Sequence, residues 1–347
     1  GVRYGRLVDI GRGIVEKKVG RSVAAGAMRY ALRQTLPHPG MFAPLLKLGR
    51  GVRPLLPGSL KDSIPPPAQQ MNKMQSAKTW PPARHTRRML LLDGCVQPLL
   101  APAINTATAR VLDSLGISLI KAKNAGCCGA ISYHLNAQQE GLDYMRRNVD
   151  AWWPYVSNGT GIDSAQGPQG AEGVEAIVMT ASGCGVTVKE YGHLLRHDAA
   201  YAEKAARISE LSRDISEILE AEIPALLPLL GSVPVDTRKP AIAFHSPCTL
   251  QHGMQIRGVV EKILLAAGFD LTIVPDAHLC CGSAGTYSIL QPALSQQLLK
   301  NKVMALETGN PVRIVTANIG CLMHVQSGTS LPVNHWIEIL DERLLIA

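Results

Sequence analysis

Eight cysteines occur in the chain at a repeated spacing. Cys127 lies 32 positions after Cys95, and Cys280 lies 32 positions after Cys248. The second cysteine of each pair opens a Cys-Cys-Gly triplet, and one more cysteine follows each triplet after a glycine. Because a repeated spacing is the mark of an internal duplication, the sequence predicts two copies of one unit. Their cysteines are Cys95, Cys127, Cys128 and Cys184 in the first copy, and Cys248, Cys280, Cys281 and Cys321 in the second.

The thiols of these cysteines are predicted to be metal ligands rather than disulfide partners. Eight cysteines in 347 residues are too few for a disulfide scaffold, and adjacent cysteines rarely pair because the ring is strained. Thiolates bind iron–sulfur clusters and structural zinc, and four per site suit both. Zinc sites usually use Cys-x-x-Cys motifs, which this sequence lacks, but the residue types alone leave both metals open. We expect one metal or cluster site per copy, with all eight cysteines as ligands.

Short apolar runs precede the cysteines and predict buried strands. MLLLDGC, AIVMTASGC, AIAFHSPC and RIVTANIGC end in a cysteine, and the triplets follow ISLIKAKNAG and LTIVPDAHL. Such runs are typical of parallel strands buried on both faces. Helices are predicted between them, over 102–115, 134–152, 254–267 and 289–307. This order predicts an α/β fold of two pseudo-symmetric β-α repeats with parallel sheets, in which the loops after the strands bring the cysteines of each copy to one sheet edge.

Four segments are expected along the chain. They are a basic N-terminal arm with a Pro-rich connector (1–87), the first cysteine-rich repeat (88–198), a helical linker with an amphipathic helix over 199–222 (199–238) and the second cysteine-rich repeat (239–347). The first copy is longer by about 16 residues, which the turn-rich stretch 157–173 supplies.

The positive charge of the chain is concentrated in its N-terminal arm. Residues 1–90 hold 17 Lys and Arg residues against three acidic residues, whereas the rest of the chain holds 18 against 24. A basic arm on an acidic body suggests docking on an acidic protein surface or on anionic lipid head groups. The alternative is a solvated basic tail.

The composition excludes several classes of protein. No run of 18 or more apolar residues occurs, so no transmembrane segment is predicted. Aromatic residues make up only 4% of the chain, which argues against a nucleic-acid partner whose bases would stack on them. The sequence contains no GxGxxG, P-loop, HExxH or GxSxG motif, so neither catalytic residues nor a flavin or nicotinamide site is predicted.

Four histidines lie close to cysteines in the second copy. His252 follows Cys248 by four positions and His324 follows Cys321 by three, so each could supply a nitrogen ligand. The first copy has no histidine at the corresponding positions, which favours a surface or hydrogen-bonding role for both. His245 and His278 flank predicted strand ends and are expected to donate hydrogen bonds near the cysteines.

The repeats resemble a known family of cysteine-rich proteins. The stretches that carry the resemblance are CCGAISYHLNAQQEGLDYMRRNVDAWWP (127–154), TASGCG (180–185), CCGSAGTYSILQP (280–292), TANIGCLMHVQSGT (316–329) and PVNHWIEIL (332–340). They are similar to the CCG cysteine-rich domains of heterodisulfide reductase and its relatives. Within that group the chain resembles the glycolate oxidase, or glycolate dehydrogenase, iron–sulfur subunits over nearly its whole length.

The resemblance implies a function in electron transfer. It suggests a non-catalytic redox subunit of a complex that oxidises glycolate to glyoxylate, in which partner subunits hold FAD and electrons pass toward a membrane acceptor such as quinone. An iron–sulfur cluster of the [4Fe–4S] kind is expected, in the cytoplasm or on the inner face of the cytoplasmic membrane. The opening residues resemble the segment after a ferredoxin-type domain, so we expect the chain to lack that N-terminal domain.

One departure from the family pattern bears on the cluster type. Heterodisulfide reductase copies end in Cys-x-x-Cys and supply five cysteines to a non-cubane cluster, but here Ala181 and Asn318 occupy the earlier cysteine positions. The nuclearity of the clusters is therefore left open, with zinc as the alternative metal. Two other functions stay open: a zinc-stabilised scaffold subunit, and the equivalent subunit of a lactate, glycerol phosphate or disulfide oxidoreductase.

Overall fold

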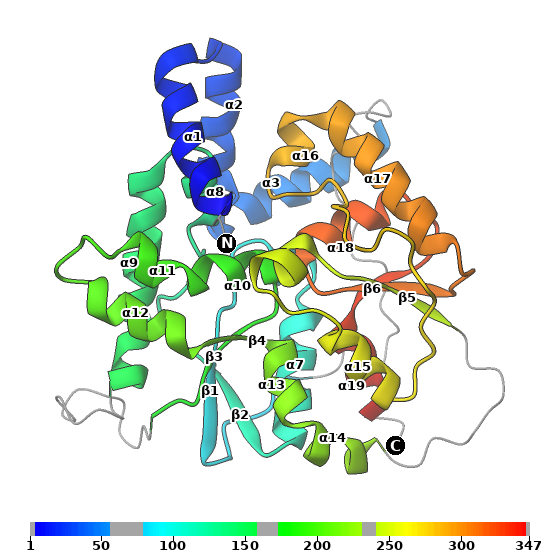
Figure 1. Cartoon of the computed structure of the whole chain (residues 1–347). Helices are drawn as coiled ribbons and strands as arrows, with labels where there is room; N and C mark the ends of the chain where they lie inside the picture. The colour runs from blue at the N-terminus through cyan, green and yellow to red at the C-terminus, as the bar shows by residue number, and fades with distance from the viewer. Residues whose placement is uncertain (1–3, 56–78, 158–172, 231–240, 345–347) are drawn as a thin grey trace.

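Two parallel β-sheets, one from each copy of the cysteine repeat, form the frame of the protein (Figure 1). The structure is a computed structural model that describes residues 4–55, 79–157, 173–230 and 241–344. Helices pack around both sheets, and every strand pair in the described residues is parallel. The predicted fold class, α/β with parallel sheets in two repeats, is confirmed.

The first sheet has the strand order β2-β1-β3-β4. Its strands are β1 (Arg87–Leu91), β2 (Ile117–Lys121), β3 (Ile177–Met179) and β4 (Ser212–Asp214). Leu90 of the central strand β1 pairs with Ile120 on one side and Ile177 on the other, and it is fully buried. The apolar run before Cys95 is thus a central strand covered on both faces.

The second sheet has the same strand order as the first, except that the strand corresponding to β2 is reduced to a single bridge. Its strands are β5 (Ile242–His245), β6 (Arg313–Thr316) and β7 (Val333–His335), in the order β5-β6-β7. The predicted strand in LTIVPDAHL shrinks to a single bridge between Leu271 and Ile242. Ile273 beyond this bridge is exposed, and Pro275 has no N–H to extend the ladder. The bridge therefore stands where β2 stands in the first sheet.

Helices and single turns connect the strands. In the first repeat they are α6 (Gln97–Leu100), α7 (Ala103–Ser114), α8 (Ala130–His134), α9 (Gln138–Val156), α10 (Ser182–Lys189), α11 (Tyr191–Leu194), α12 (Ala202–Leu211), α13 (Ile215–Ala221) and α14 (Ile223–Leu229). In the second they are the π-helical turn η3 (Thr249–Gly253), α15 (Val259–Ala266), α16 (Tyr287–Leu290), α17 (Pro292–Glu307), α18 (Ile319–Gln326) and α19 (Trp336–Leu344). The helix predicted over 254–267 begins only at residue 259, and the one over 134–152 corresponds to α9, which begins at residue 138.

The segment expected to be a helical linker also supplies a strand. The amphipathic helix predicted over 199–222 is interrupted by β4, which pairs with β3. The apolar pattern gave no sign of this strand because its residues, Ser-Arg-Asp, are polar. After β4 and after β7 a glutamate three residues on accepts a hydrogen bond from the backbone N–H at the helix start: Glu217 from Asp214 and Glu338 from His335, both at 2.8 Å. Each sheet thus ends in an equivalent strand–helix unit.

A single hydrophobic core joins the two repeats. One cluster of buried side chains includes Leu91 and Ile104 from the first repeat and Ile242 and Trp336 from the second. Helix α19, at the end of the chain, packs against α7, and Arg110 of α7 donates to Asp341 of α19 at 2.9 Å. The shared core fixes the position of one repeat relative to the other.

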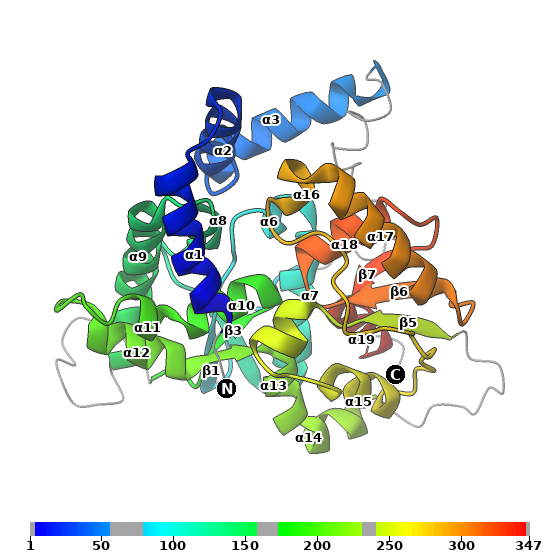
Figure 2. The ribbon, with the colours of Figure 1, turned by 45° about the horizontal axis from the view of Figure 1, so that its top comes forward.

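The basic arm folds into helices that contact the first repeat through ion pairs. It contains α1 (Tyr4–Val19), α2 (Val23–Thr35), α3 (Pro39–Val52) and the 3₁₀ turn η1 (Arg53–Leu55). In both views α1 stands beside α8 (Figures 1 and 2). Arg6 forms an ion pair with Glu190 at 2.8 Å and Arg33 with Glu140 at 3.1 Å. The arm is therefore docked on acidic side chains of its own chain rather than being a solvated tail.

Parts of two sequence predictions lie outside the described residues. These are most of the Pro-rich connector (56–78) and of the turn-rich insertion (158–172). Among the described residues, no helix combines the length and apolar character needed to cross a bilayer.

Candidate metal centres

The first four cysteines follow the carboxyl ends of three neighbouring strands. Cys95 lies between β1 and α6, Cys127 and Cys128 lie between β2 and α8, and Cys184 lies in the first turn of α10 after β3. Loops after parallel strands meet at one edge of a sheet. The side chain of Cys127 hydrogen-bonds with those of Cys95 and Cys128, and Cys128 hydrogen-bonds with Cys184. The first cysteine cluster is therefore a continuous series of four thiols.

The second cysteine cluster repeats this arrangement. Cys248 follows β5, the Cys280–Cys281 pair precedes α16, and Cys321 lies in the first turn of α18 after β6. The side chain of Cys280 hydrogen-bonds with those of Cys248 and Cys281, and Cys281 hydrogen-bonds with Cys321. The structure thus brings together each set of four cysteines that the duplicated spacing grouped.

The state of these thiols suits metal binding. All eight are free, and five of them are buried with exposed fractions of 6% or less. Hydrogen bonds from Cys128 and Cys95 lower the pKa of Cys127 well below its usual value, and those from Cys248 and Cys281 do the same for Cys280. In the second cluster a hydrogen bond from Cys281 lowers the pKa of Cys321 as well. The first cluster therefore has one thiol, and the second has two, that readily become the thiolate a metal requires. Free, buried and convergent thiols fit the donor set of an iron–sulfur centre or of zinc.

The glycine of each Cys-Cys-Gly triplet holds its loop tightly against the next helix. Gly129 has φ +88° and Gly282 has φ +93°, a left-handed conformation that favours glycine. A Cβ atom at Gly129 would lie 2.5 Å from the carbonyl oxygen of Gly141 in α9, and one at Gly282 would lie 2.5 Å from that of Ser295 in α17. The N–H of Gly282 also donates to Cys280 Sγ at 3.3 Å. Only glycine permits this close approach.

Polar side chains bind the backbone of the first Cys-Cys pair. Asn148 Nδ2 donates to the carbonyl oxygen of Cys127 at 3.0 Å, and the hydroxyl of Tyr191 donates to that of Cys128 at 2.8 Å. Both side chains are fully buried, so neither hydrogen bond competes with solvent. They fix the two thiols in position before a metal arrives.

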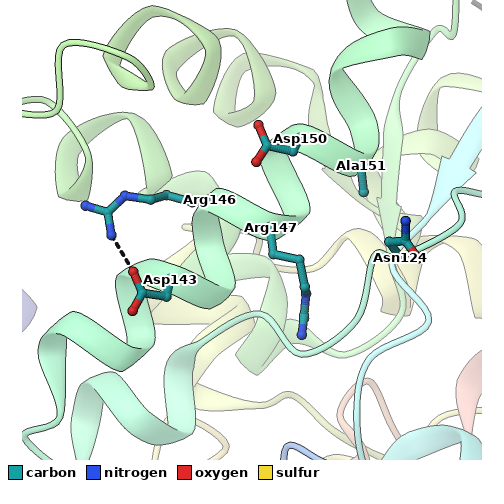
Figure 3. Close-up of a pocket in the computed structure, with 6 residues that line it drawn as sticks. All are labelled: Asn124, Asp143, Arg146, Arg147, Asp150 and Ala151. Atoms are coloured by element: carbon teal, nitrogen blue, oxygen red, sulfur yellow. Dashed lines mark hydrogen bonds and ion pairs between the residues drawn. The ribbon is translucent and has the colours of Figure 1, made fainter.

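One cation stands beside each cluster. Arg147 donates to the carbonyl oxygen of Cys127 at 3.1 Å. Figure 3 shows that its side chain extends away from the neighbouring Arg146–Asp143 pair. Arg147 and Asn124 both line a surface pocket. In the second copy the buried Lys302 donates to the carbonyl oxygens of Asp276 and Ala277 at 2.9 and 3.3 Å, shortly before Cys280. These positive charges oppose the negative charge that bound thiolates bring.

The histidines near the second cluster differ in their surroundings. His252 is exposed and its Nε2 contacts the carbonyl oxygen of His278 at 3.0 Å, while the side chain of His278 is exposed. The ring of His324 is buried and contacts Ser295 Oγ at 3.1 Å. His245 instead lies with Cys281 and Cys321 in a group whose ligand atoms are all within 4.8 Å of one another. Of the two histidines considered as ligands from the sequence, neither belongs to this group.

The segments that carry the last cysteine of each cluster meet across the repeat boundary. The N–H of Ser182 donates to the carbonyl oxygen of Ala317 at 3.2 Å, so the starts of α10 and α18 are in direct contact. A small pocket beside this contact is lined by Cys95 and Cys184 of the first repeat and by Ile319 of the second. The last cysteines of both clusters are therefore carried by two helices that touch at their first turns.

Comparison with known proteins agrees with this geometry. The CCG family, described as a cysteine-rich domain, matches residues 89–189 and 242–326, one match for each copy. The chain is 49% identical over 344 residues to the glycolate oxidase iron-sulfur subunit of Escherichia coli, a match that covers 99% of this chain and 78% of the relative. It is 25% identical to the probable glycolate oxidase iron-sulfur subunit of Bacillus subtilis, covering 94% of this chain and 73% of the relative. It is 24% identical to lactate utilization protein A of Bacillus licheniformis, covering 72% and 97%.

The chain belongs to the family of CCG cysteine-rich proteins, and within it to the glycolate oxidase iron–sulfur subunits. This confirms the resemblance seen in the sequence. It also agrees with the prediction that the chain is a redox subunit of an oxidoreductase complex rather than the catalytic one.

Proposed function

We propose that this chain transfers electrons within a glycolate-oxidising complex. In this proposal each cysteine cluster binds one iron–sulfur centre through its four thiolates, with the [4Fe–4S] type expected. Electrons come from FAD in partner subunits and leave toward a membrane acceptor such as quinone, on the cytoplasmic side of the membrane. The observation that carries the proposal is the presence of two largely buried four-cysteine clusters, with the backbone contact of Ser182 with Ala317 between the segments that carry their last cysteines.

The residues around the clusters have properties that suit an electron carrier. A bound iron–sulfur centre supplies reversible one-electron chemistry. Buried thiolates hold it and keep water away, while the N–H of Gly282 and the amide of Asn318 donate to sulfur at 3.3 and 3.4 Å. Such donors stabilise the more negative, reduced state. Arg147 and Lys302 lower the cost of adding an electron in the same way.

The sequence identity of this chain to its relatives favours glycolate as the substrate of the complex. The chain matches the Escherichia coli glycolate oxidase subunit at 49% identity but lactate utilization protein A at 24%. A lactate-oxidising complex is the second candidate, because 97% of that relative aligns with this chain. Co-expression with flavin subunits, followed by assay with glycolate and lactate, distinguishes the two.

The test of the redox function is the metal content of the chain purified without oxygen. We expect iron and acid-labile sulfide, together with an EPR signal after reduction by dithionite. The sequence contains eight cysteines, all in the two clusters, so a cluster signal must arise from them. Zinc alone in folded protein would contradict electron transfer and favour the scaffold function.

A further inference from the structure

His245 is a buried histidine whose ring has no nitrogen or oxygen atom as a hydrogen-bond partner. It is the last residue of β5, three positions before Cys248, and its exposed fraction is 2%. Within the described residues, neither Nδ1 nor Nε2 meets a nitrogen or oxygen partner, and the hydrogen bond of the side chain is with the thiol of Cys321. Burying a polar group away from other nitrogen and oxygen atoms is unfavourable, so a buried imidazole whose partner is a cluster thiol requires an explanation.

Other buried histidines of the same repeat have partners. His335 Nε2 contacts the carbonyl oxygen of Thr180 at 2.9 Å, and His324 Nε2 contacts Ser295 Oγ at 3.1 Å. Low polarity in the core is thus not the reason why His245 has only a thiol as its partner. The difference lies in what surrounds it, because its ligand atom and those of Cys281 and Cys321 are within 4.8 Å of one another.

The backbone of β5 keeps the ring in this place. His245 pairs with Thr316 of β6, and Thr316 Oγ1 donates to the carbonyl oxygen of His245 at 3.0 Å. Cys321 follows the same strand β6, so the ladder that positions the histidine also positions one of its neighbouring thiols. An imidazole nitrogen and two thiolates at such separations are a common set of metal ligands.

We propose that His245 is a nitrogen ligand of the second centre, beside Cys281 and Cys321, and that at a centre with four ligands it takes the place of one of the other two thiolates. This inference rests on the proposed function, in which both clusters hold metal. The first repeat has Leu92 three positions before Cys95, where the second has His245 before Cys248. The two centres therefore differ in their ligands: the first is bound by sulfur alone and the second by sulfur and nitrogen.

The difference has a direct consequence for electron transfer. A neutral imidazole adds no negative charge, and histidine ligation raises the reduction potential of an iron–sulfur centre relative to thiolate ligation. The second centre would hold an electron more strongly than the first. Electrons entering at the first repeat would then move toward the second.

The test measures metal and nitrogen ligation separately. The chain is prepared anaerobically with ¹⁵N-labelled histidine, its iron and zinc are counted, and the metal is examined by ENDOR where it is paramagnetic and by X-ray absorption at the metal edge otherwise. We expect a directly bonded histidine nitrogen in wild type and its loss in His245→Leu, which copies Leu92. His324→Gln is the matched control and should keep the signal, because His324 contacts Ser295.

The outcomes distinguish the inference from the proposed function. Metal at both clusters without a bound histidine nitrogen overturns the inference and leaves the proposed function intact. Absence of metal from folded wild-type chain overturns both. Because the labelled wild type decides the question by itself, the test does not depend on His245→Leu folding. A nitrogen signal that persists in folded His245→Leu also overturns the inference.

Discussion

Asn318 connects the last cysteines of the two clusters. Its Nδ2 donates to Cys321 Sγ at 3.4 Å, and its Oδ1 accepts from the N–H of Gly183, adjacent to Cys184, at 3.4 Å. Ala181, the corresponding residue of the first repeat, has no side chain that could donate to Cys184. One side chain therefore contacts a thiol of one cluster and the backbone beside a thiol of the other.

Replacing Asn318 with Ala is expected to lower the reduction potential of the second centre. The amide stabilises negative charge on Cys321, and its loss makes the reduced state less favourable. A hydrogen bond to a charged group is worth about 1.5–3 kcal/mol, which for a one-electron couple sets an upper limit of about 65–130 mV. Because only the difference between the two redox states counts, a shift on the order of tens of millivolts is expected. Redox titration followed by EPR measures this shift.

An exposed amide supplies the control for this change. Asn301 lies on α17 and contacts only Gln297 among the hydrogen bonds of its side chain that the structure gives. Asn301→Ala should leave both potentials where they are in wild type. An unchanged potential in Asn318→Ala would show that its amide does not act on the bound centre.

Gly282→Ala is expected to cost more stability than Gly285→Ala. Both glycines have positive φ, +93° and +63°, so each substitution carries about 1–2 kcal/mol of backbone strain. A Cβ at Gly282 would also lie 2.5 Å from Ser295 O, whereas one at Gly285 would meet nothing within 4 Å. Gly282→Ala should therefore move the loop away from α17 and reduce the metal bound by the second cluster. Urea unfolding and metal analysis measure both effects; equal losses in the two variants would contradict this account.

The cysteine clusters were largely predictable because the spacing of the cysteines along the sequence shows the duplication. The interval of 32 residues, the two Cys-Cys-Gly triplets and the later Gly-Cys pairs grouped the eight cysteines into two sets. The apolar runs before Cys95, Cys184, Cys248 and Cys321 placed these four after strands. Parallel topology then required the loops to meet at one edge. These inferences needed only local patterns and one general rule of sheet architecture.

The features that the sequence did not reveal depend on tertiary contacts. Strand β4 is three polar residues whose pairing with β3 carries no apolar signal. The place of His245 was visible three residues before Cys248, but not that its ring would be buried beside the thiols of Cys281 and Cys321. The arm gave a charge pattern, yet which acidic groups it would meet was fixed by folding: Arg6 pairs with Glu190.

Asp214→Asn is expected to change how stability depends on pH. Asp214 is buried, its Oδ1 accepts from the N–H of Ser216 at 2.9 Å, and its Oδ2 has no hydrogen-bond partner among the described residues. Burial raises its pKa from 3.8 to about 6. Because the folded state holds the proton more tightly, the group stabilises the fold at low pH, and this contribution is lost as pH rises through about 6.

The size of this effect follows from the shift in pKa. The rise from 3.8 to about 6 corresponds to about 3 kcal/mol over the whole titration. The asparagine can still accept from Ser216 but does not ionise. The stability of Asp214→Asn relative to wild type should therefore be about 2.5 kcal/mol greater at pH 7 than at pH 4, where the unfolded carboxyl is already partly ionised. Urea unfolding of both proteins across this range tests the prediction. Asp143→Asn, at an exposed ion pair of little expected worth, is the control, and a constant difference between wild type and Asp214→Asn would contradict the account.

Cys127→Ser and Cys280→Ser are expected to remove metal from one centre each. Cys127 hydrogen-bonds with Cys95 and Cys128, and Cys280 with Cys248 and Cys281, so the direct thiol contacts of each stay within its own repeat. Each variant should lose about half of the bound metal, because thiolates supply the ligands of both centres. The two variants are matched controls for each other, since the triplets are equivalent. Loss of all metal from either folded variant would mean that the eight cysteines form one shared site, with the contact between α10 and α18 at its middle.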